Sequence, residues 1–191
     1  FFEGQTAYPI SVGEKGSLWL KMIASGDAGH GSTPRPNEAP QYLIEAIDIL
    51  KEREIESELS PSMREFIAQA GHGKGGVSGF VMKRPVFVDH LVKPKLMSNP
   101  LTRAAVINTV HLTGFGGANE PNVVPSEVFA LLDCRLQPDV KPEEFILWLE
   151  SLVGPNIHFE LIGSQQGNWS TWDDPLYYAL VRAATESEED S

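Results

Sequence analysis

Cysteine is nearly absent from the sequence, and this scarcity excludes one class of fold. A single Cys134 in 191 residues cannot form an internal disulfide, so the chain is no disulfide-stabilised scaffold. Long hydrophobic runs are absent too, since no stretch approaches the roughly 18 apolar residues of a membrane-spanning helix. Basic residues are scarce: 15 Lys and Arg against 26 Asp and Glu give a net charge of −11. That charge argues against nucleic acid and against an anionic membrane as the main partner, because both need a basic surface.

What is present fits a globular α+β domain. The hydrophobic content is 41%, and a chain of this length can bury roughly 70% of its unfolded surface. Alternating apolar residues predict strands over residues 17–24, 105–113, 127–136 and 156–162. Helical spacing predicts helices after Asn37 and over residues 142–153 and 175–185. The core order βαββαβ predicts a two-layer, ferredoxin-like sandwich of helices on a mostly antiparallel sheet.

An insertion of about residues 57–104 interrupts this order. Within it, residues 61–70 fit a short helix and residues 80–91 fit either an extended or a helical segment. We expect the stretch Gly71-His-Gly-Lys-Gly-Gly76 to be a flexible loop. It lacks the GxxxxGK[ST] spacing of a phosphate-binding loop. The role of the insertion stays open at this point.

Local signatures of metal binding and nucleophilic catalysis do not occur in the sequence. There is no HExxH, His-x-Asp or CxxC motif, so we expect no metal ligand in this chain. Cys134 alternates with polar residues on a strand and is interpreted as a small buried hydrophobic residue. Glu143 and Glu144 are explained by the positive end of their predicted helix.

Three polar residues are harder to assign to structure alone. His30 lies in Gly29-His-Gly-Ser-Thr-Pro34, where small neighbours allow the close approach of a ligand or of another chain. Asn122 stands at the start of the clearest strand, and Arg135 follows thirteen residues later on its less apolar face. An Arg on a sheet surface needs an anion, and a bidentate carboxylate ligand is one choice. An ion pair with Asp133 is the other.

These residues occur in a pattern that resembles a known family. The segments that carry the resemblance are Ile10-Ser-Val-Gly-Glu-Lys-Gly16, Gly29-His-Gly-Ser-Thr-Pro34, Asn122-Val-Val-Pro125 and Asp133-Cys-Arg135. They look like the dimerisation (lid) domain of the M20 family of zinc metallopeptidases. Asn99-Pro-Leu-Thr102 and the long insertion resemble the carboxypeptidase S and Gly-Xaa carboxypeptidase branch. The resemblance covers nearly the whole chain.

The resemblance implies that the parent protein is a carboxypeptidase or an N-acyl amino acid amidohydrolase. His30 would be catalytic, polarising the scissile carbonyl in the active site of the other subunit. Asn122 and Arg135 would bind the substrate, a peptide or N-acyl amino acid, with Arg135 holding its free carboxylate. The lid sheets of two subunits would join edge to edge in a homodimer.

The family's metal ligands have no match here: a His-x-Asp pair, a Glu-Glu pair, a further acidic residue and a late His. We therefore expect zinc to be bound by residues outside this chain, and the chain to be an excised lid that is inactive alone. The resemblance divides it into a segment arriving from the catalytic domain (1–16), the lid (17–163) and a return segment (164–191).

Two other functions remain open from the sequence. One is a stand-alone ferredoxin-like regulatory module that binds free amino acids, and the other is a dimerisation scaffold that has lost catalysis. The loop around His30 favours the enzyme, because a simple sensor would not need it. The sequence does not specify a cellular compartment.

Overall fold

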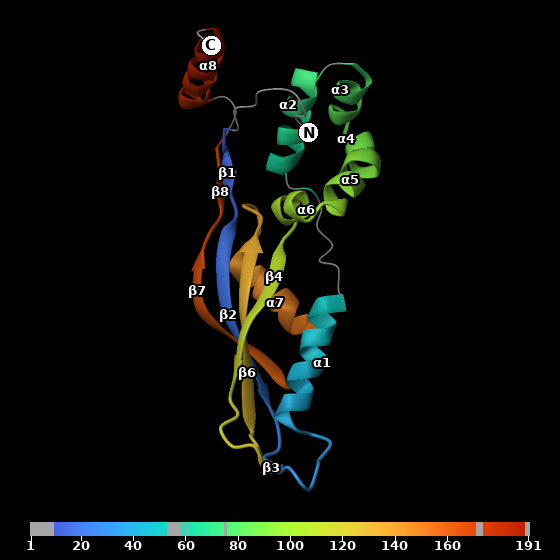
Figure 1. Cartoon of the computed structure of the whole chain (residues 1–191), viewed down its shortest axis with the longest axis vertical. Helices are drawn as coiled ribbons and strands as arrows, with labels where there is room; N and C mark the ends of the chain where they lie inside the picture. The colour runs from blue at the N-terminus through green and yellow to red at the C-terminus, as the bar shows by residue number, and fades with distance from the viewer. Residues whose placement is uncertain (1–9, 53–58, 60, 75, 171–173, 190–191) are drawn as a thin grey trace.

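A four-stranded antiparallel sheet organises the chain (Figure 1). The computed structural model describes residues 10–52, 59, 61–74, 76–170 and 174–189. Across the sheet the strands are β4 (Thr109–Gly116), β6 (Glu127–Leu136), β2 (Gly16–Ser25) and β7 (Ile157–Gln165). Every neighbouring pair is antiparallel. The predicted α+β class is confirmed.

Two helices, α1 (Ala39–Glu52) and α7 (Pro142–Val153), pack on the sheet and close the main core. Alternate residues of β2 and β6 point into this core, because successive side chains of a strand face opposite sides. Its fully buried members include Leu18, Leu20, Met22, Cys134 and Leu149. The predicted burial of Cys134 is therefore confirmed. The helix α7 begins at Pro142, whose lack of an N–H costs nothing in a first turn.

Residues 59–107, called here the helical segment, separate α1 from β4. The segment holds α2 (Pro61–Lys74), α3 (Gly76–Met82), α4 (Pro85–Phe87), the π-helical turn η1 (Val88–Val92), α5 (Lys93–Ser98) and α6 (Pro100–Val106). It has a small core of its own, which includes Ile67, Met82, Val88 and Leu96.

Two predictions for this region are wrong. The expected loop at residues 71–76 is helical at both ends, since α2 continues to Lys74 and α3 begins at Gly76. Each helical Gly costs about 1 kcal/mol, and the packing of this small core offsets that cost. The strand expected from residue 105 begins later, at Thr109, because α6 extends to Val106.

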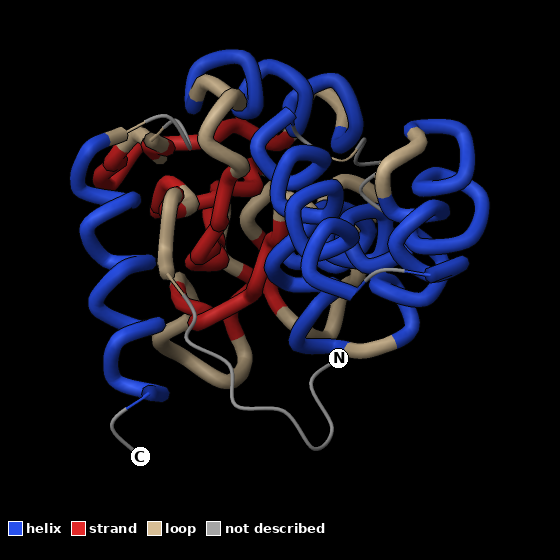
Figure 2. Tube along the Cα trace, turned by 90° about the horizontal axis from the view of Figure 1, so that it is seen from above, coloured by secondary structure: helices blue, strands red, loops and turns tan. Residues whose placement is uncertain are grey.

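Short strand pairs lie at both ends of the sheet. β1 (Gly13–Glu14) pairs with β8 (Asn168–Trp169), and β3 (Gly29–His30) pairs with β5 (Val123–Val124). The last helix, α8 (Pro175–Glu189), lies on one side of the strands and the helical segment on the other (Figure 1, Figure 2). Among the described helices, none has the length and apolarity that crossing a membrane requires.

Candidate functional site

The loop that carries His30 is joined to the loop that carries Asn122. His30 lies opposite Val123 in the β3–β5 pair, and the N–H of Gly31 donates to the carbonyl oxygen of Asn122 at 2.9 Å. Gly26 anchors the start of the first loop. A Cβ there would lie 2.5 Å from the backbone of Asn37 and of Ala39, so only glycine fits. The structure thus brings His30 and Asn122 together at one exposed end of the sheet.

The imidazole of His30 is held by its own turn. The backbone N–H of Ser32 donates to Nδ1 at 3.3 Å, and the Ser32 hydroxyl oxygen lies 2.8 Å from the same atom. A neutral imidazole that accepts at Nδ1 carries its proton on Nε2. In that tautomer His30 can donate one hydrogen bond from Nε2 to a carbonyl or oxyanion oxygen.

Arg135 lies at the far end of β6 and is paired with Asp133. Nη2 of Arg135 donates to Oδ2 of Asp133 at 3.0 Å, and Nε lies 2.9 Å from Oδ1 in an ion-pair contact without hydrogen-bond alignment. The ion pair left open by the sequence is thus present. The Arg135 side chain is nevertheless 47% exposed, and its Nη1 has no acceptor among the described residues. The guanidinium can still take a carboxylate ligand.

Lys15 adjoins Arg135 and binds the end of the helical segment. Its Nζ donates to the carbonyl oxygens of Ala104 at 2.9 Å and Ile107 at 2.6 Å. Burial, and then the charge of Arg135, lower the pKa of the Lys15 ammonium from 10.5 to about 8. Nε2 of Gln137 donates to the carbonyl oxygen of Ala105 at 2.9 Å. These two side chains hold the carboxyl end of α6 beside Arg135.

Sequence reasoning did not single out Lys15 or Gln137. The acceptors of both side chains are backbone carbonyl groups, which leave no signal in the sequence. The one available hint was that Lys15 falls within the stretch Ile10–Gly16, which carries part of the family resemblance.

The three predicted site residues do not meet within one chain. In the β2–β6 pairing Ser17 lies opposite Arg135, whereas Ser25 lies opposite Glu127 near the His30 end. The eight residue steps from one point to the other span roughly 27 Å at about 3.4 Å per step. His30 and Asn122 are therefore at one end of the sheet and Arg135 is at the other.

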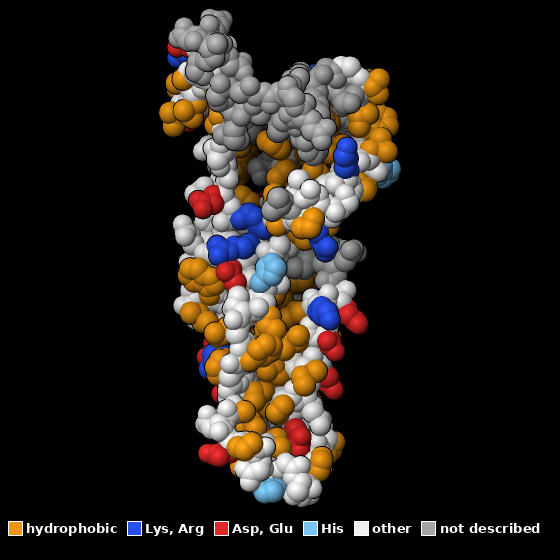
Figure 3. All heavy atoms as spheres, viewed as in Figure 1, with side chains coloured by type: hydrophobic (Ala, Val, Ile, Leu, Met, Phe, Trp, Pro, Cys, Tyr) orange, Lys and Arg blue, Asp and Glu red, His pale blue; other side chains and the backbone are white. Residues whose placement is uncertain are grey.

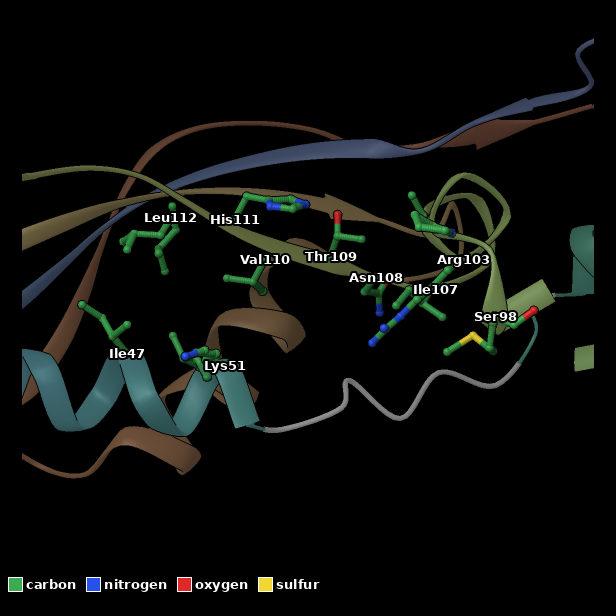
Figure 4. A pocket seen from close by; sticks show the side chains of 15 residues that line it. Ile47, Lys51, Ser98, Arg103, Ile107, Asn108, Thr109, Val110, His111 and Leu112 are labelled. Atoms are coloured by element: carbon green, nitrogen blue, oxygen red, sulfur yellow. The ribbon is translucent and has the colours of Figure 1, made fainter. Parts of the chain in front are cut away.

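A pocket of about 590 Å³ lies between the end of α1, the helices α5 and α6, and the strand β4 (Figure 4). Its lining is mostly apolar: Ile47 and Leu50 come from α1, and Val110 and Leu112 come from β4. No carboxylate occurs among the described residues that line it. The pocket lies beside β4, at the edge of the sheet.

A metal centre is not formed by the described part of the chain. No group of three or more His, Cys, Asp or Glu side chains is close enough there to hold a metal ion. The exposed His30 interacts with Ser32 and not with a carboxylate.

Comparison with known proteins identifies the family. Residues 12–157 match the model of the peptidase dimerisation domain of the M20 peptidases. The chain belongs to the M20 peptidase dimerisation domain family. The matched residues include the His30 loop, Asn122 and Arg135. The recognition made from the sequence is confirmed.

Relatives of this M20 dimerisation domain are hydrolases. The chain is 25% identical over 182 residues to the human N-fatty-acyl-amino acid synthase/hydrolase PM20D1, covering 93% of this chain and 36% of that protein. It is 25% identical over 140 residues to a probable carboxypeptidase S-like 2 of Dictyostelium discoideum, covering 72% of this chain and 26% of that protein. The chain thus spans about a third of the length of these relatives.

The fold is also similar to that of a solved dipeptidase. The di-peptidase Dug1p of Saccharomyces cerevisiae matches with a TM-score of 0.56 at 17% identity, over 91% of this chain and 40% of that chain. This likeness concerns the fold alone. It supports the α+β sandwich.

Proposed function

We propose that this chain is the dimerising lid of a larger metal-dependent peptidase or amidohydrolase whose substrates carry a free carboxylate. Each active site would combine Arg135 of one chain with His30 and Asn122 of another. The observation that carries the proposal is that these residues lie at opposite ends of the sheet within one chain, with roughly 27 Å of strand between Arg135 and Glu127, the end near His30. A dipeptide or the head of an N-acyl amino acid cannot reach over that distance.

Antiparallel pairing of two β4 edges would close this separation. β4 begins at Thr109, opposite Arg135, and ends at Gly116, opposite Phe129 near the His30 end. A two-fold axis between two β4 strands places the start of one strand beside the end of the other. The His30 end of one copy therefore approaches the Arg135 end of its partner, and the two sheets become one.

The β4 edge is the better candidate for the dimer interface, because it is less covered by helices than the β7 edge. On the helix side of the sheet α7 packs beside β7, whereas β4 borders the open pocket. Hydrophobic side chains gather on the surface between β4 and α1 (Figure 3). They include Ile44, Leu112 and Phe115, each more than a third exposed. A second copy would bury them.

In this proposal the chain's own residues bind and orient the substrate. Arg135 holds the free carboxylate, and Nε2 of His30 donates to the carbonyl oxygen as negative charge develops there. Asn122 supports the same end of the substrate. The names of the relatives support a substrate class of peptides or N-acyl amino acids. Any metal would be held by parts of the protein outside this chain, because the described residues form no centre for it.

Oligomeric state tests the proposed edge. Sedimentation of the chain should show a dimer at high micromolar concentration. Phe115→Asp on β4, 66% exposed, should give a monomer, whereas Leu161→Asp on β7, 56% exposed, should leave the dimer intact. A wild-type monomer, or the reverse pattern of variants, would contradict the proposal.

Substrate analogues test the role of Arg135. In the complete enzyme, Arg135→Ala should raise KM for substrates with a free carboxylate and have little effect on their amidated analogues. An equal loss on both would mean that Arg135 serves only its pair with Asp133.

A further inference from the structure

The charge of the protein is divided between two regions of opposite sign. The helical segment, residues 59–107, has seven of the 15 Lys and Arg but only two of the 26 Asp and Glu. Its net charge is therefore +5, and the remaining residues, with eight basic against 24 acidic side chains, carry −16. The overall value of −11, from which the sequence argued against an anionic membrane partner, averages over both regions.

The same segment exposes large apolar side chains. At least 38% of the side-chain surface is exposed in Phe66, Val77, Phe80, Val86, Phe87 and Leu91. The small core of the segment is built from other residues, among them Ile67, Met82, Val88 and Leu96. The exposed set is therefore not needed to fold the segment. Hydrophobic side chains are visible along its outer edge (Figure 3).

Basic and apolar side chains are interleaved on this surface. The guanidinium carbon of Arg84 lies 4.3 Å from the ring centroid of Phe80, and the ring of Phe87 lies 6.3 Å from that of Phe80. Lys83 and Lys95 are exposed nearby in sequence. One of the two acidic residues, Asp89, is already neutralised by Arg64 at 2.9 Å. The exposed apolar set together with Lys83, Arg84 and Lys95 is called the basic apolar surface.

We infer that the basic apolar surface docks on anionic phospholipid membranes. Lys and Arg around Phe, Val and Leu are the composition of helices that lie in a membrane interface. Protein–protein interfaces, in contrast, are depleted in Lys. Each Lys or Arg near an anionic leaflet strengthens binding by roughly fivefold. Salt limits the reach of a charge to about 8 Å, so the acidic side chains of α1 and α7, which lie along the sheet and below the segment in Figure 1, do not cancel this attraction.

This inference is independent of the proposed lid function, because it uses none of His30, Asn122 and Arg135. It concerns where the enzyme is held and not what it cleaves. The docking would place the helical segment at the lipid surface and leave the β4 edge free. The apolar residues of the surface lie in α2, α3, α4 and η1, its basic residues are Lys83, Arg84 and Lys95, and none of them lines the pocket beside β4.

Co-sedimentation with vesicles tests the inference. The chain should bind vesicles of phosphatidylserine and phosphatidylcholine, should not bind phosphatidylcholine alone, and should be released by high salt. Lys83→Glu with Lys95→Glu should weaken binding by roughly 25-fold or more. The matched control, Lys21→Glu with Lys141→Glu, changes the net charge equally outside the segment and should bind like the wild type.

A second pair of measurements separates lipid from other partners. Phe80→Ser with Leu91→Ser should weaken vesicle binding without altering the fold, as checked by circular dichroism. The inference would be overturned if the chain bound soluble heparin as tightly as vesicles and if these two substitutions had no effect on vesicle binding. Such a result would show a general anion site. The inference would also be overturned if the chain bound vesicles and the complete enzyme did not, because the surface would then be covered within the enzyme.

Discussion

Removing the charged head of Lys15 should loosen the helical segment at its attachment to the sheet. Lys15 is the side chain that binds two carbonyl groups at the end of α6, those of Ala104 and Ile107. Lys15→Met keeps the aliphatic stem and removes only the ammonium, so packing is preserved while both hydrogen bonds are lost. Gln137 retains its own bond to Ala105.

The magnitude follows from two opposing effects. A hydrogen bond from a charged donor contributes about 1.5–3 kcal/mol at best. Burial of the ammonium and repulsion from Arg135, which together lower its pKa to about 8, reduce that benefit. We expect a net local loss of about 1.5 kcal/mol, which is roughly a tenfold increase in the opening of α6.

Amide hydrogen exchange measures this opening directly. The N–H of Ile107, which donates to the carbonyl of Arg103 at 3.2 Å, should exchange about tenfold faster in Lys15→Met. The N–H of Leu132 in the central strand should be unchanged, and Lys21→Met, which removes an exposed ion pair with Glu160, should leave both unchanged. Unaltered exchange at Ile107 would refute the attachment role of Lys15.

Three further predictions concern pH, thiol chemistry and the His30 loop. Between about pH 8 and 10.5 the unfolded chain binds more protons at Lys15 than the folded chain, so the unfolding free energy of the wild type should rise with pH relative to Lys15→Met in denaturant titrations. Burial, and then the charge of Asp133, raise the pKa of the Cys134 thiol to about 12, so thiol reagents at pH 8 should label it only on unfolding. Gly26→Ala should cost about 1–3 kcal/mol in stability and lower Tm, because its Cβ would overlap the backbone at Ala39; an unchanged Tm would show that the loop adapts.

The strands and helices of the sandwich could be predicted because each repeats one pattern over many residues. β6 and α7 begin and end where the sequence indicated, since alternation and helical spacing persist over their whole length. The helical segment could not be predicted in the same way. Residues 71–74 and 76 of its glycine-rich stretch are helical because packing of Ile67 and its neighbours overrides local propensity, and that packing involves residues distant in sequence.

The residues of the candidate site could be predicted from the sequence, but their arrangement in space could not. His30 and Asn122 stood out because small neighbours and strand boundaries surround them, yet their pairing depends on a two-residue bridge between loops far apart in the chain. The Asp133–Arg135 pair was one of two expected partners, because residues two apart on a strand share a face. The separation of Arg135 from Asn122 follows from the length of the strand predicted over residues 127–136, whereas the position of His30 beside Asn122 follows only from the β3–β5 pairing.

A mixing experiment with the complete enzyme tests the shared site most directly. His30→Ala and Arg135→Ala homodimers should each be nearly inactive on a substrate with a free carboxylate. After subunit exchange, the mixed dimer would have one site with both residues intact and one site with neither. Activity should therefore return to about a quarter of the wild-type value, since half of the dimers are mixed and half of their sites are complete. Failure to regain activity after verified exchange would contradict a site built from two chains.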